Sequence, residues 1–312
     1  MYVWESSYFW LRILKIQEAI SFTETHTVPQ LPAPVRLQEY GVGIFVAVPT
    51  KSALKKALKK KRVTVNDAVA STATLIHGGE RIRLAIPEGV GPTTKLIFPL
   101  RVLFEDDHLA AIHKPAGILV SGNRFKTIAN ALPQNLQRSP LPDAARPQPV
   151  HRLDYATTGI LLVGKTSSSI RALNQMFADK EIAKTYYAVA IGAMEPAGEI
   201  TSDIDGKRAQ SAYRVCESVA SERFTRLNLV ELRPQTGRRH QLRKHLSGSG
   251  NPILGDRDYG QEPLILKGKG MYLHACSLRF RHPFTGEEMV LEDAPPASFK
   301  KLFLPDRGRA AN

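Results

Sequence analysis

Three short polar segments lie next to apolar stretches of the chain, where their side chains could do chemistry. The first is His151-Arg152-Leu153-Asp154, which comes shortly before the apolar run 159–163. An aspartate at the mouth of a buried strand can act as a nucleophile, a general base or a metal ligand. The same residue can also simply cap a turn. Taken alone, Asp154 leaves both interpretations open.

The second and third segments could assist such a carboxylate. In Lys184-Thr185-Tyr186-Tyr187, successive side chains of a strand point to opposite faces, so Tyr186 could enter a cleft. A pair of core tyrosines is the alternative. In the run 233–245, Thr236 is predicted to cap a helix over 237–246, and arginines clustered beside helix amides suit a phosphate. An ordinary basic helix is the alternative there.

The elements that must position these segments are a mixture of strands and helices. Apolar runs predict strands on both sides of the acidic turn 105–107, and at 159–163, 184–191 and 223–232. The spacing of Ile170, Leu173 and Phe177 predicts one face of a helix. Five prolines in 133–149 predict an ordered loop or a flexible flap. Because regular crossover helices are few, we expect an α+β fold around a large mixed sheet.

Positive charge is concentrated in one part of the chain. The sequence has 43 Lys and Arg against 29 Asp and Glu, a net charge of +14, which favours a polyanionic partner. Residues 37–98 hold ten basic and four acidic side chains, whereas residues 1–36 are neutral overall. A solvated surface that keeps the protein soluble is the alternative. The asymmetry predicts a small nucleic-acid-binding module in front of a larger body.

The composition excludes several other classes of protein. Two cysteines are too few for a disulfide framework or a four-cysteine zinc site. The apolar stretch 8–16 is interrupted by Arg12 and Lys15, and is shorter than the roughly 18 apolar residues of a spanning helix. Glu5 precedes it where a signal peptide would have basic residues. We therefore expect a cytoplasmic protein with no membrane association.

A lysine-rich helix is predicted within residues 49–62. Its apolar residues follow a helical stripe and its lysines cover the remaining faces, among them Lys55, Lys56, Lys59 and Lys60. A short strand 63–65, a turn at Asn66-Asp67, Gly78-Gly79 and the strand 81–87 follow. This order resembles the small RNA-binding domain named after ribosomal small-subunit protein four, although Gly43-Ile44-Phe45 replaces its usual Arg-Leu-Asp opening. Lysines on one exposed helix can follow RNA phosphates, whereas an ordinary solvated helix is the alternative.

The larger body carries a second resemblance. The motifs HRLDYATTG, KTYYAVAIG and TGRRHQLRKH, preceded by FEDDHLAAIHKPAGILV, closely resemble the RluA-type pseudouridine synthases over residues 100–295. Thr158 stands where that family usually has a serine. The expected organisation is an N-terminal extension over 1–36, an RNA-binding domain over 37–87, a linker over 88–98 and a catalytic domain over 99–312. The resemblance implies that this last domain has a mainly antiparallel mixed sheet with flanking helices and a central cleft.

The resemblance also implies roles for individual residues. Asp154 matches the essential aspartate, Tyr186 the tyrosine beside the target base, and Arg243 the basic residue that pairs with the aspartate. Arg152 matches the residue that enters the RNA stack as the uridine leaves it. The remaining expected contacts with RNA are His151, Arg238 and His240.

The implied reaction is the isomerisation of uridine to pseudouridine in structured RNA. It needs no cofactor or metal, and the five-residue spacing of His240 and His245 does not place two ligands on one helical face. Ribosomal RNA of the large subunit is the favoured substrate, transfer RNA is an alternative, and no obligate protein partner is evident. A noncatalytic RNA-binding assembly factor and a metal-dependent RNA hydrolase are weaker alternatives.

Overall fold

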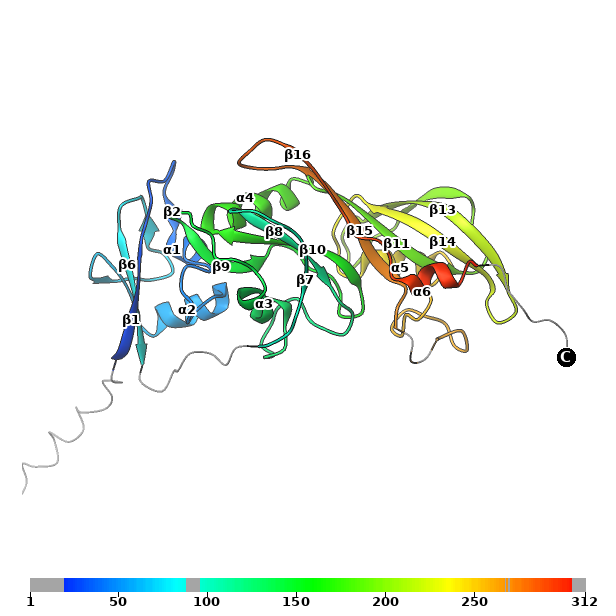
Figure 1. Ribbon diagram of the computed structural model, residues 1–312, viewed down its shortest axis with the longest axis horizontal. Coiled ribbons are helices and arrows are strands. Elements are labelled where there is room, and N and C mark those ends of the chain that lie inside the picture. The colour runs from blue at the N-terminus through cyan, green and yellow to red at the C-terminus, as the bar shows by residue number, and fades with distance from the viewer. Residues whose placement is uncertain (1–19, 88–95, 267, 269, 305–312) are drawn as a thin grey trace, which may run out of the picture. The chain divides into compact units, whose positions relative to one another are not determined.

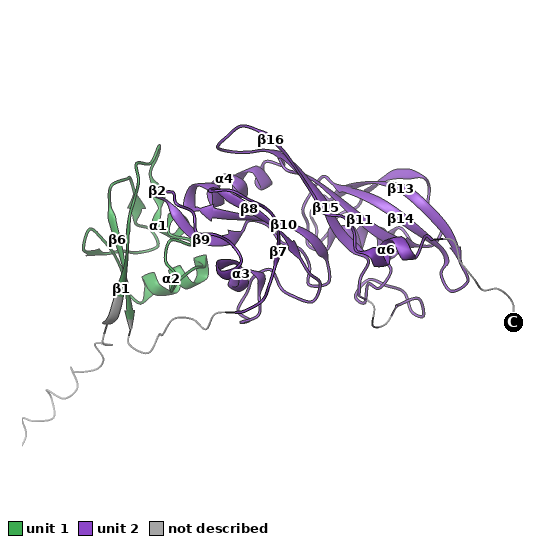
Figure 2. Ribbon diagram, in the orientation of Figure 1, with its two compact units in different colours: residues 1–94 green, residues 95–312 purple. Residues whose placement is uncertain are grey.

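The chain forms two compact units, residues 1–94 and 95–312, shown in different colours in Figure 2. The structure is a computed structural model that describes residues 20–87, 96–266, 268 and 270–304. The predicted amphipathic stretch 8–16 lies outside these residues. Within the described part, no helix is long and apolar enough to cross a bilayer.

The first unit is a small α/β module (Figure 1). Its elements are β1 (Ile20–Thr27), β2 (Val35–Arg36), α1 (Leu37–Tyr40), α2 (Lys51–Lys59), β3 (Val63–Val65), β4 (Ala68–Val69), β5 (Leu75–Ile76) and β6 (Arg81–Pro87). One sheet has the order β1-β6-β3-β4, and β2 pairs with β5. The helix α2, the β3–β4 hairpin and the strand β6 confirm the order of elements predicted from the sequence.

Strand β1 is the difference from the sequence-based expectation. It falls in the stretch 1–36 that was expected to be an N-terminal extension, yet it pairs with β6 over the whole of Thr23–Thr27. Val28, which follows it, is buried in the core of this unit together with Leu37 and Ile82. The polar alternation of the sequence gave no strong apolar signal, so only the long-range pairing with β6 defines this strand.

Helix α2 separates its apolar and basic residues cleanly. Thr50 caps the helix, since its Oγ1 accepts a hydrogen bond from the backbone amide of Ala53 at 3.1 Å. Leu54, Ala57 and Leu58 are buried. The exposed lysines that form no ion pair within the described residues are Lys55, Lys56, Lys59 and Lys60. The helix therefore presents a basic face to solvent while its other face completes the core.

The second unit is built on one ten-stranded sheet (Figure 1). Its strands are β7 (Arg101–Glu105), β8 (Leu109–Lys114), β9 (Ala144–Pro149), β10 (Thr158–Thr166), β11 (Ala183–Ile191), β12 (Ala197–Thr201), β13 (Gln210–Ser221), β14 (Thr225–Pro234), β15 (Leu273–Arg281) and β16 (Glu288–Glu292). The main order is β12-β13-β14-β11-β15-β10-β8-β7, while β16 pairs with β15 and β9 with β10. This mixed, mainly antiparallel sheet confirms the expected fold class.

The helical elements of this unit are short. They are α3 (Ile128–Ala131), the 3₁₀ turn η2 (Leu132–Gln134), α4 (Ser167–Ala178), α5 (Gln241–Gly248) and α6 (Ala297–Lys301). The predicted helix face is confirmed in α4, where Ile170 and Leu173 are buried. The expectation of a loop throughout 133–149 is wrong at its end, because Pro147 and Pro149 lie in β9. Among the described strands, β9 pairs only with β10, so it is an edge strand. Proline is tolerated in an edge strand because its missing amide is not needed for a second set of hydrogen bonds.

The only parallel pairing in the described sheet joins β10 to β15. It spans Thr158↔His274 and Gly159↔Ala275. Gly159 has a φ of +116°, and a Cβ built on it would lie 2.2 Å from the carbonyl oxygen of Ala275. Only glycine tolerates this approach. The close contact fixes where β10 begins, and therefore where the HRLD segment before it lies.

A buried lysine holds the loop between that segment and β10. Lys114, at the end of β8, is fully buried, and its Nζ donates hydrogen bonds to the carbonyl oxygens of Pro115, Tyr155 and Thr157 at 2.9, 3.3 and 2.7 Å. Burial lowers the pKa of Lys114 to about 8, an effect that the negative charge of Asp154 opposes. The lysine thus anchors the backbone on the C-terminal side of Asp154.

A buried polar network holds the start of β10 from the other side. Thr158 Oγ1 and His274 Nδ1 are 2.8 Å apart, and the other ring nitrogen of His274 is 2.8 Å from the carbonyl oxygen of Asp293. The carboxylate of Asp293 also pairs with His113 at 2.5 Å and with Arg101. Four strands, β7, β8, β10 and β15, are therefore tied together next to the loop that carries Asp154.

Replacing Lys114 by Met should change how the stability of this unit depends on pH. The folded pKa of about 8 lies below the ordinary value of 10.5. Between these pH values the unfolded chain binds more protons, so wild-type stability from this group increases with pH. The free energy of unfolding, measured in urea, should be lower for Lys114→Met than for wild type, by roughly 1–3 kcal/mol at about pH 7. This difference should grow between about pH 8 and pH 10.

Lys300→Met supplies the control, because Lys300 is an exposed lysine of α6. Its unfolding free energy should stay parallel to that of wild type over the same range. A constant difference between wild type and Lys114→Met would contradict the burial of the charged ammonium group.

Candidate active site

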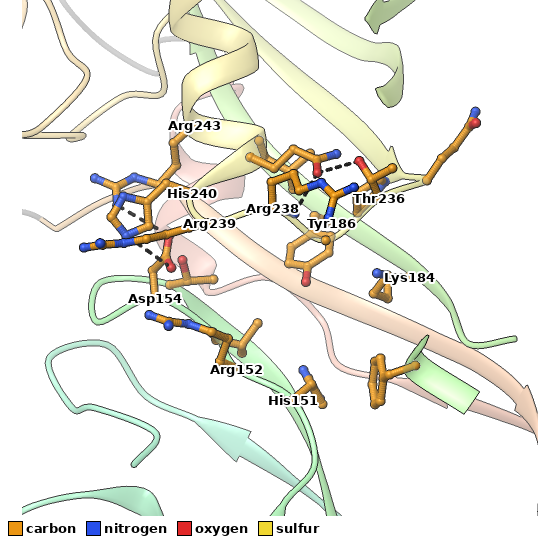
Figure 3. Close-up of a pocket in the computed structure, with 18 of the residues that line it drawn as sticks. His151, Arg152, Asp154, Lys184, Tyr186, Thr236, Arg238, Arg239, His240 and Arg243 are labelled. Atoms are coloured by element: carbon orange, nitrogen blue, oxygen red, sulfur yellow. Dashed lines mark hydrogen bonds and ion pairs between the residues drawn. The ribbon is translucent and has the colours of Figure 1, made fainter. Parts of the chain in front are cut away.

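The three polar segments predicted to do chemistry meet around one cavity in the second unit (Figure 3). The cavity has a volume of about 630 Å³. Residues 151–154 and Thr157 form one wall, Tyr186 and Lys184 of β11 form another, and the loop 234–240 with the start of α5 closes the third. The predicted site residues of this unit that line it are His151, Arg152, Asp154, Tyr186, Arg238, His240 and Arg243.

Asp154 faces two side chains of the third wall. Its Oδ2 is 3.4 Å from Nη1 of Arg243, and its Oδ1 is 3.6 Å from Nε2 of His240. The Asp154 side chain is 16% exposed, so it is sheltered but reachable from the cavity. Both contacts are longer than a strong charge-assisted hydrogen bond. Asp154 is thus oriented by Arg243 and His240 while its oxygens keep lone pairs for a substrate.

Arg243 is held much more tightly by two other acids. Its Nε and Nη2 bind the two carboxylate oxygens of Asp256 at 2.7 and 2.6 Å, and Nη2 also donates to Asp258 at 2.7 Å. The guanidinium lies over the ring of Tyr259 at 4.8 Å. Burial alone would lower the pKa of Arg243, but the bonds from Asp256 and Asp258 outweigh it and raise the pKa above its usual value. The cation is permanent, and its direction is fixed by the 256–259 loop.

Asp256 and Asp258 were missed by the sequence-based prediction. They lie in a loop between α5 and β15 that carries no periodic pattern, and their distance from Asp154 in the chain is large. Asp256 also accepts hydrogen bonds from the backbone amides of Asp258 and Tyr259, so it shapes the loop itself. No feature of the sequence alone connected this loop with Arg243.

His240 joins the same cluster as a neutral ring. Its Nδ1 is 2.9 Å from the hydroxyl of Tyr259. Burial lowers its pKa, Asp154 opposes this in part, and the positive charges of Arg243 and Arg239 lower the pKa further. At neutral pH, His240 therefore contributes hydrogen bonding rather than charge.

Tyr186 points into the cavity from β11 (Figure 3). It packs between two parts of the hydrophobic core. Burial raises the pKa of its hydroxyl, and the negative charge of Asp154 raises it further. The phenol therefore keeps its proton and offers an apolar ring face together with a polar end, the combination that suits a flat heterocycle.

Arg152 and His151 lie side by side in the sequence but differ in their surroundings. Arg152 is exposed at the cavity, and its guanidinium forms no ion pair within the described residues. His151 accepts a hydrogen bond at Nε2 from the backbone amide of Leu162, and its ring packs at a tilt against Phe177 with ring centroids 4.7 Å apart. Burial lowers the pKa of His151 to about 3. His151 is thus a neutral ring that supports the wall, whereas Arg152 is free to bind.

The third segment folds differently from the prediction. Helix α5 begins at Gln241, not at Gly237, and its N-cap residue is His240 with a φ of 56°. The predicted N-cap Thr236 instead accepts a hydrogen bond from the Gln210 amide and donates one to Oε1 of Gln241. The segment before α5 is therefore a loop pinned to β13, so the predicted array of arginines on helix amides is wrong. Arg238 lines the cavity, and its Nε donates to the carbonyl oxygen of Arg208.

The site contains one carboxylate facing the cavity, a fixed cation behind it and an aromatic wall opposite. No group of three or more His, Cys, Asp or Glu that could hold a metal ion occurs within the described residues. The predicted lysines of α2 belong to the other unit. The arrangement can hold a flat base against Tyr186 and present a sugar to Asp154.

Comparisons with known proteins agree with this chemistry. The profile of the RNA pseudouridylate synthase family matches residues 108–248. The ribosomal large subunit pseudouridine synthase D of Nitrosomonas europaea is 32% identical, over 88% of this chain and 86% of the relative. The corresponding synthase C of Rickettsia felis is 30% identical, over 88% of this chain and 97% of the relative.

A solved structure shows the same relationship. Human RNA pseudouridylate synthase domain containing 4 is 25% identical with a TM-score of 0.51, over 64% of this chain and 90% of the human chain. The cavity, its carboxylate and these relatives lead to one conclusion. This chain belongs to the RluA-type family of RNA pseudouridine synthases.

Proposed function

We propose that this protein converts specific uridines of large-subunit ribosomal RNA to pseudouridine, with Asp154 as the catalytic carboxylate. The observation that carries the proposal is the position of Asp154, which faces a cavity of about 630 Å³ with Arg243 behind it and Tyr186 on the neighbouring wall. The relatives named for ribosomal large-subunit synthases support the choice of RNA. This substrate agrees with the cytoplasmic location expected from the sequence.

The reaction is an isomerisation that uses only the substrate's own atoms. The bond from uracil nitrogen 1 to the ribose breaks, and the uracil turns. Its carbon 5 then forms the new bond to the same ribose carbon, the carbon 5 proton leaves, and nitrogen 1 takes up a proton. Asp154 serves as the anion that meets the electron-poor ribose carbon, either directly or through another intermediate. Arg243 keeps that anion in position. Tyr186 holds the detached base and assists the later removal of the proton through hydrogen bonding by its neutral hydroxyl, not as an ionised base.

The target base must leave its stack to reach Asp154. Extruding a base costs roughly a few kcal/mol, which contacts in the vacated space can offset. We assign this role to Arg152, because its planar guanidinium is exposed at the cavity and forms no ion pair within the described part of the chain. Arg238 and His240 complete the wall that the extruded nucleotide would meet. His151 supports the Arg152 backbone through its bond with Leu162.

The first unit supplies sequence-independent affinity in this proposal. The four exposed lysines of α2 and its C-cap, which form no ion pair within the described residues, can neutralise phosphates and release counterions. The basic domain of the sequence-based organisation, residues 37–87, would then act as an RNA-binding module, completed by β1.

Asp154→Asn should abolish pseudouridine formation while RNA binding persists. The amide keeps the shape of the carboxylate but removes the negative charge that the ribose carbon requires. Purified protein is incubated, with a metal chelator present, with ribosomal RNA or with transfer RNA, and pseudouridines are mapped in each. Wild type should modify large-subunit ribosomal RNA under these conditions.

Asp107→Asn is the matched control, since Asp107 is an exposed aspartate outside the cavity. It should leave the product yield unchanged. Substantial turnover by Asp154→Asn would overturn the assignment of the catalytic carboxylate. Product in transfer RNA alone would overturn the assignment of the substrate.

Replacing Lys55, Lys56, Lys59 and Lys60 by Gln should weaken RNA binding and flatten its salt dependence. Each lost phosphate contact lowers the slope of log affinity against log salt by roughly 0.7 to 0.9. The single-turnover rate on saturating enzyme should change little, because the cavity lies in the other unit. Lys51→Gln is the control with a small effect, because Lys51 already pairs with Glu39 at 2.5 Å. An unchanged slope in the fourfold variant would mean that this face is only solvated.

A further inference from the structure

A second hollow adjoins the candidate active site on the second unit. It has a volume of about 650 Å³ and is lined by residues of β11, β14 and β15 together with Lys180, Ile182 and Gln235. The two hollows share Lys180, Lys184, Pro234 and Gln235. We call this second hollow the side groove. It continues the cavity of Asp154 along the amino-terminal end of β11.

The wall of the side groove is strongly basic. Its charged residues are Lys180, Lys184, Arg233 and Arg279, and no aspartate or glutamate lines it. The two arginines pair with acids outside the wall, Arg233 with Glu231 at 2.7 Å and Arg279 with Glu288 at 3.8 Å. The two lysines form no ion pair within the described residues. The groove therefore holds two positive charges that nothing described in the protein neutralises.

This arrangement is costly for the protein alone. Lys184 is half-buried, and burial lowers its pKa, with a further lowering from the nearby positive charge of Lys180. The neighbours Asp179 and Glu181 do not line the groove, and Asp179 accepts hydrogen bonds from Gln175 instead. A bound anion would favour the charged form of half-buried Lys184, which burial and the positive charge of Lys180 disfavour. A phosphate group fits both the charge and the donors of two ammonium groups.

We propose that the side groove binds the RNA backbone phosphate next to the target uridine, held by Lys180 and Lys184. This inference rests on the proposed function, because it places the flanking nucleotide relative to a uridine at Asp154. It gives the site a means of fixing the register of the RNA strand that does not depend on base identity.

The geometry of β11 supports a phosphate contact close to the target base. Lys184 and Tyr186 are two residues apart on one strand, so their side chains lie on the same face roughly 6.8 Å apart. Both line the cavity of Asp154. A base held against Tyr186 would therefore have a neighbouring phosphate within reach of Lys184, and Lys180 extends the same positive path outward.

The test uses the full-length protein and a short RNA stem-loop centred on the uridine mapped as the substrate. Lys184→Gln and Lys180→Gln should each weaken RNA binding roughly tenfold, since a hydrogen bond to a charged group is lost. Lys184→Arg should restore binding, because it keeps the charge. Lys300→Gln in α6, outside both hollows, should bind as wild type.

A neutral methylphosphonate placed at one backbone position at a time then locates the contact. In wild type, replacing the phosphate next to the target uridine should weaken binding about as much as Lys180→Gln and Lys184→Gln do together. In the variant that carries both changes, the same replacement should cost nothing more, because both partners of that phosphate are already gone. At every other position, the loss should be the same in both proteins.

Two results would overturn the inference. One is that the binding losses from the methylphosphonate and from the lysine changes multiply at every backbone position. The other is that Lys180→Gln and Lys184→Gln both bind RNA as wild type does. Failure of the proposed function gives a different result, because wild type would then form no pseudouridine in this RNA. Because Lys180 is exposed, the Lys180→Gln variant tests the side groove even where a change at half-buried Lys184 disturbs the fold. A loss for Lys184→Gln that Lys184→Arg does not restore would also contradict a phosphate contact.

Discussion

The positive charge of Arg243 is shared among three carboxylates, and the rest of the site depends on how that sharing is arranged. A buried arginine without partners would be strongly destabilising. Asp256 binds two of its nitrogens at 2.6 and 2.7 Å, and Asp258 adds a third bond, which leaves Nη1 for Asp154 at 3.4 Å. The guanidinium is therefore oriented by the 256–259 loop. Asp154 therefore has a fixed cationic neighbour, while its carboxylate oxygens stay available to a substrate.

The other half of this contact is set by the backbone around Asp154. Lys114 holds the carbonyls of Tyr155 and Thr157, and the Asp293 network holds Thr158 through His274. The parallel pairing at Gly159 fixes the start of β10 against β15. A catalytic group needs positioning to within a fraction of an ångström. The buried groups of Lys114 and Asp293 would be unfavourable without partners. Through these hydrogen bonds they hold the loop that follows Asp154 in position.

Local patterns explain what could be predicted from the sequence. The lysine helix, the strand β11 and the helix α4 follow from the spacing of their own residues. Side chains of the HRLD, KTYY and TGRRHQLRK motifs line one cavity. Thr236 failed as a helix cap because its hydroxyl bonds with Gln210 and Gln241, residues whose positions depend on β13 and α5. A cap rule that considers only neighbouring residues cannot include such partners.

Long-range contacts explain what was missed. Asp256 follows Asp154 by more than a hundred residues, and β1 is defined by its pairing with β6 rather than by its own apolar residues. Two of the three carbonyl partners of Lys114, those of Tyr155 and Thr157, are distant from it in the sequence. The burial of Lys114 depends on the loop 155–157 folding over it. In each case the fold supplies a partner that no local pattern contains.

Arg243→Lys tests most directly whether the shape of the guanidinium, and not its charge alone, positions Asp154. A lysine keeps the positive charge but cannot bind Asp256 through two nitrogens and also reach Asp154. We predict a single-turnover rate lower by roughly 100-fold, the cost of a displacement of about 1 Å, with RNA binding preserved. A rate close to that of wild type would contradict the central role of the shared guanidinium.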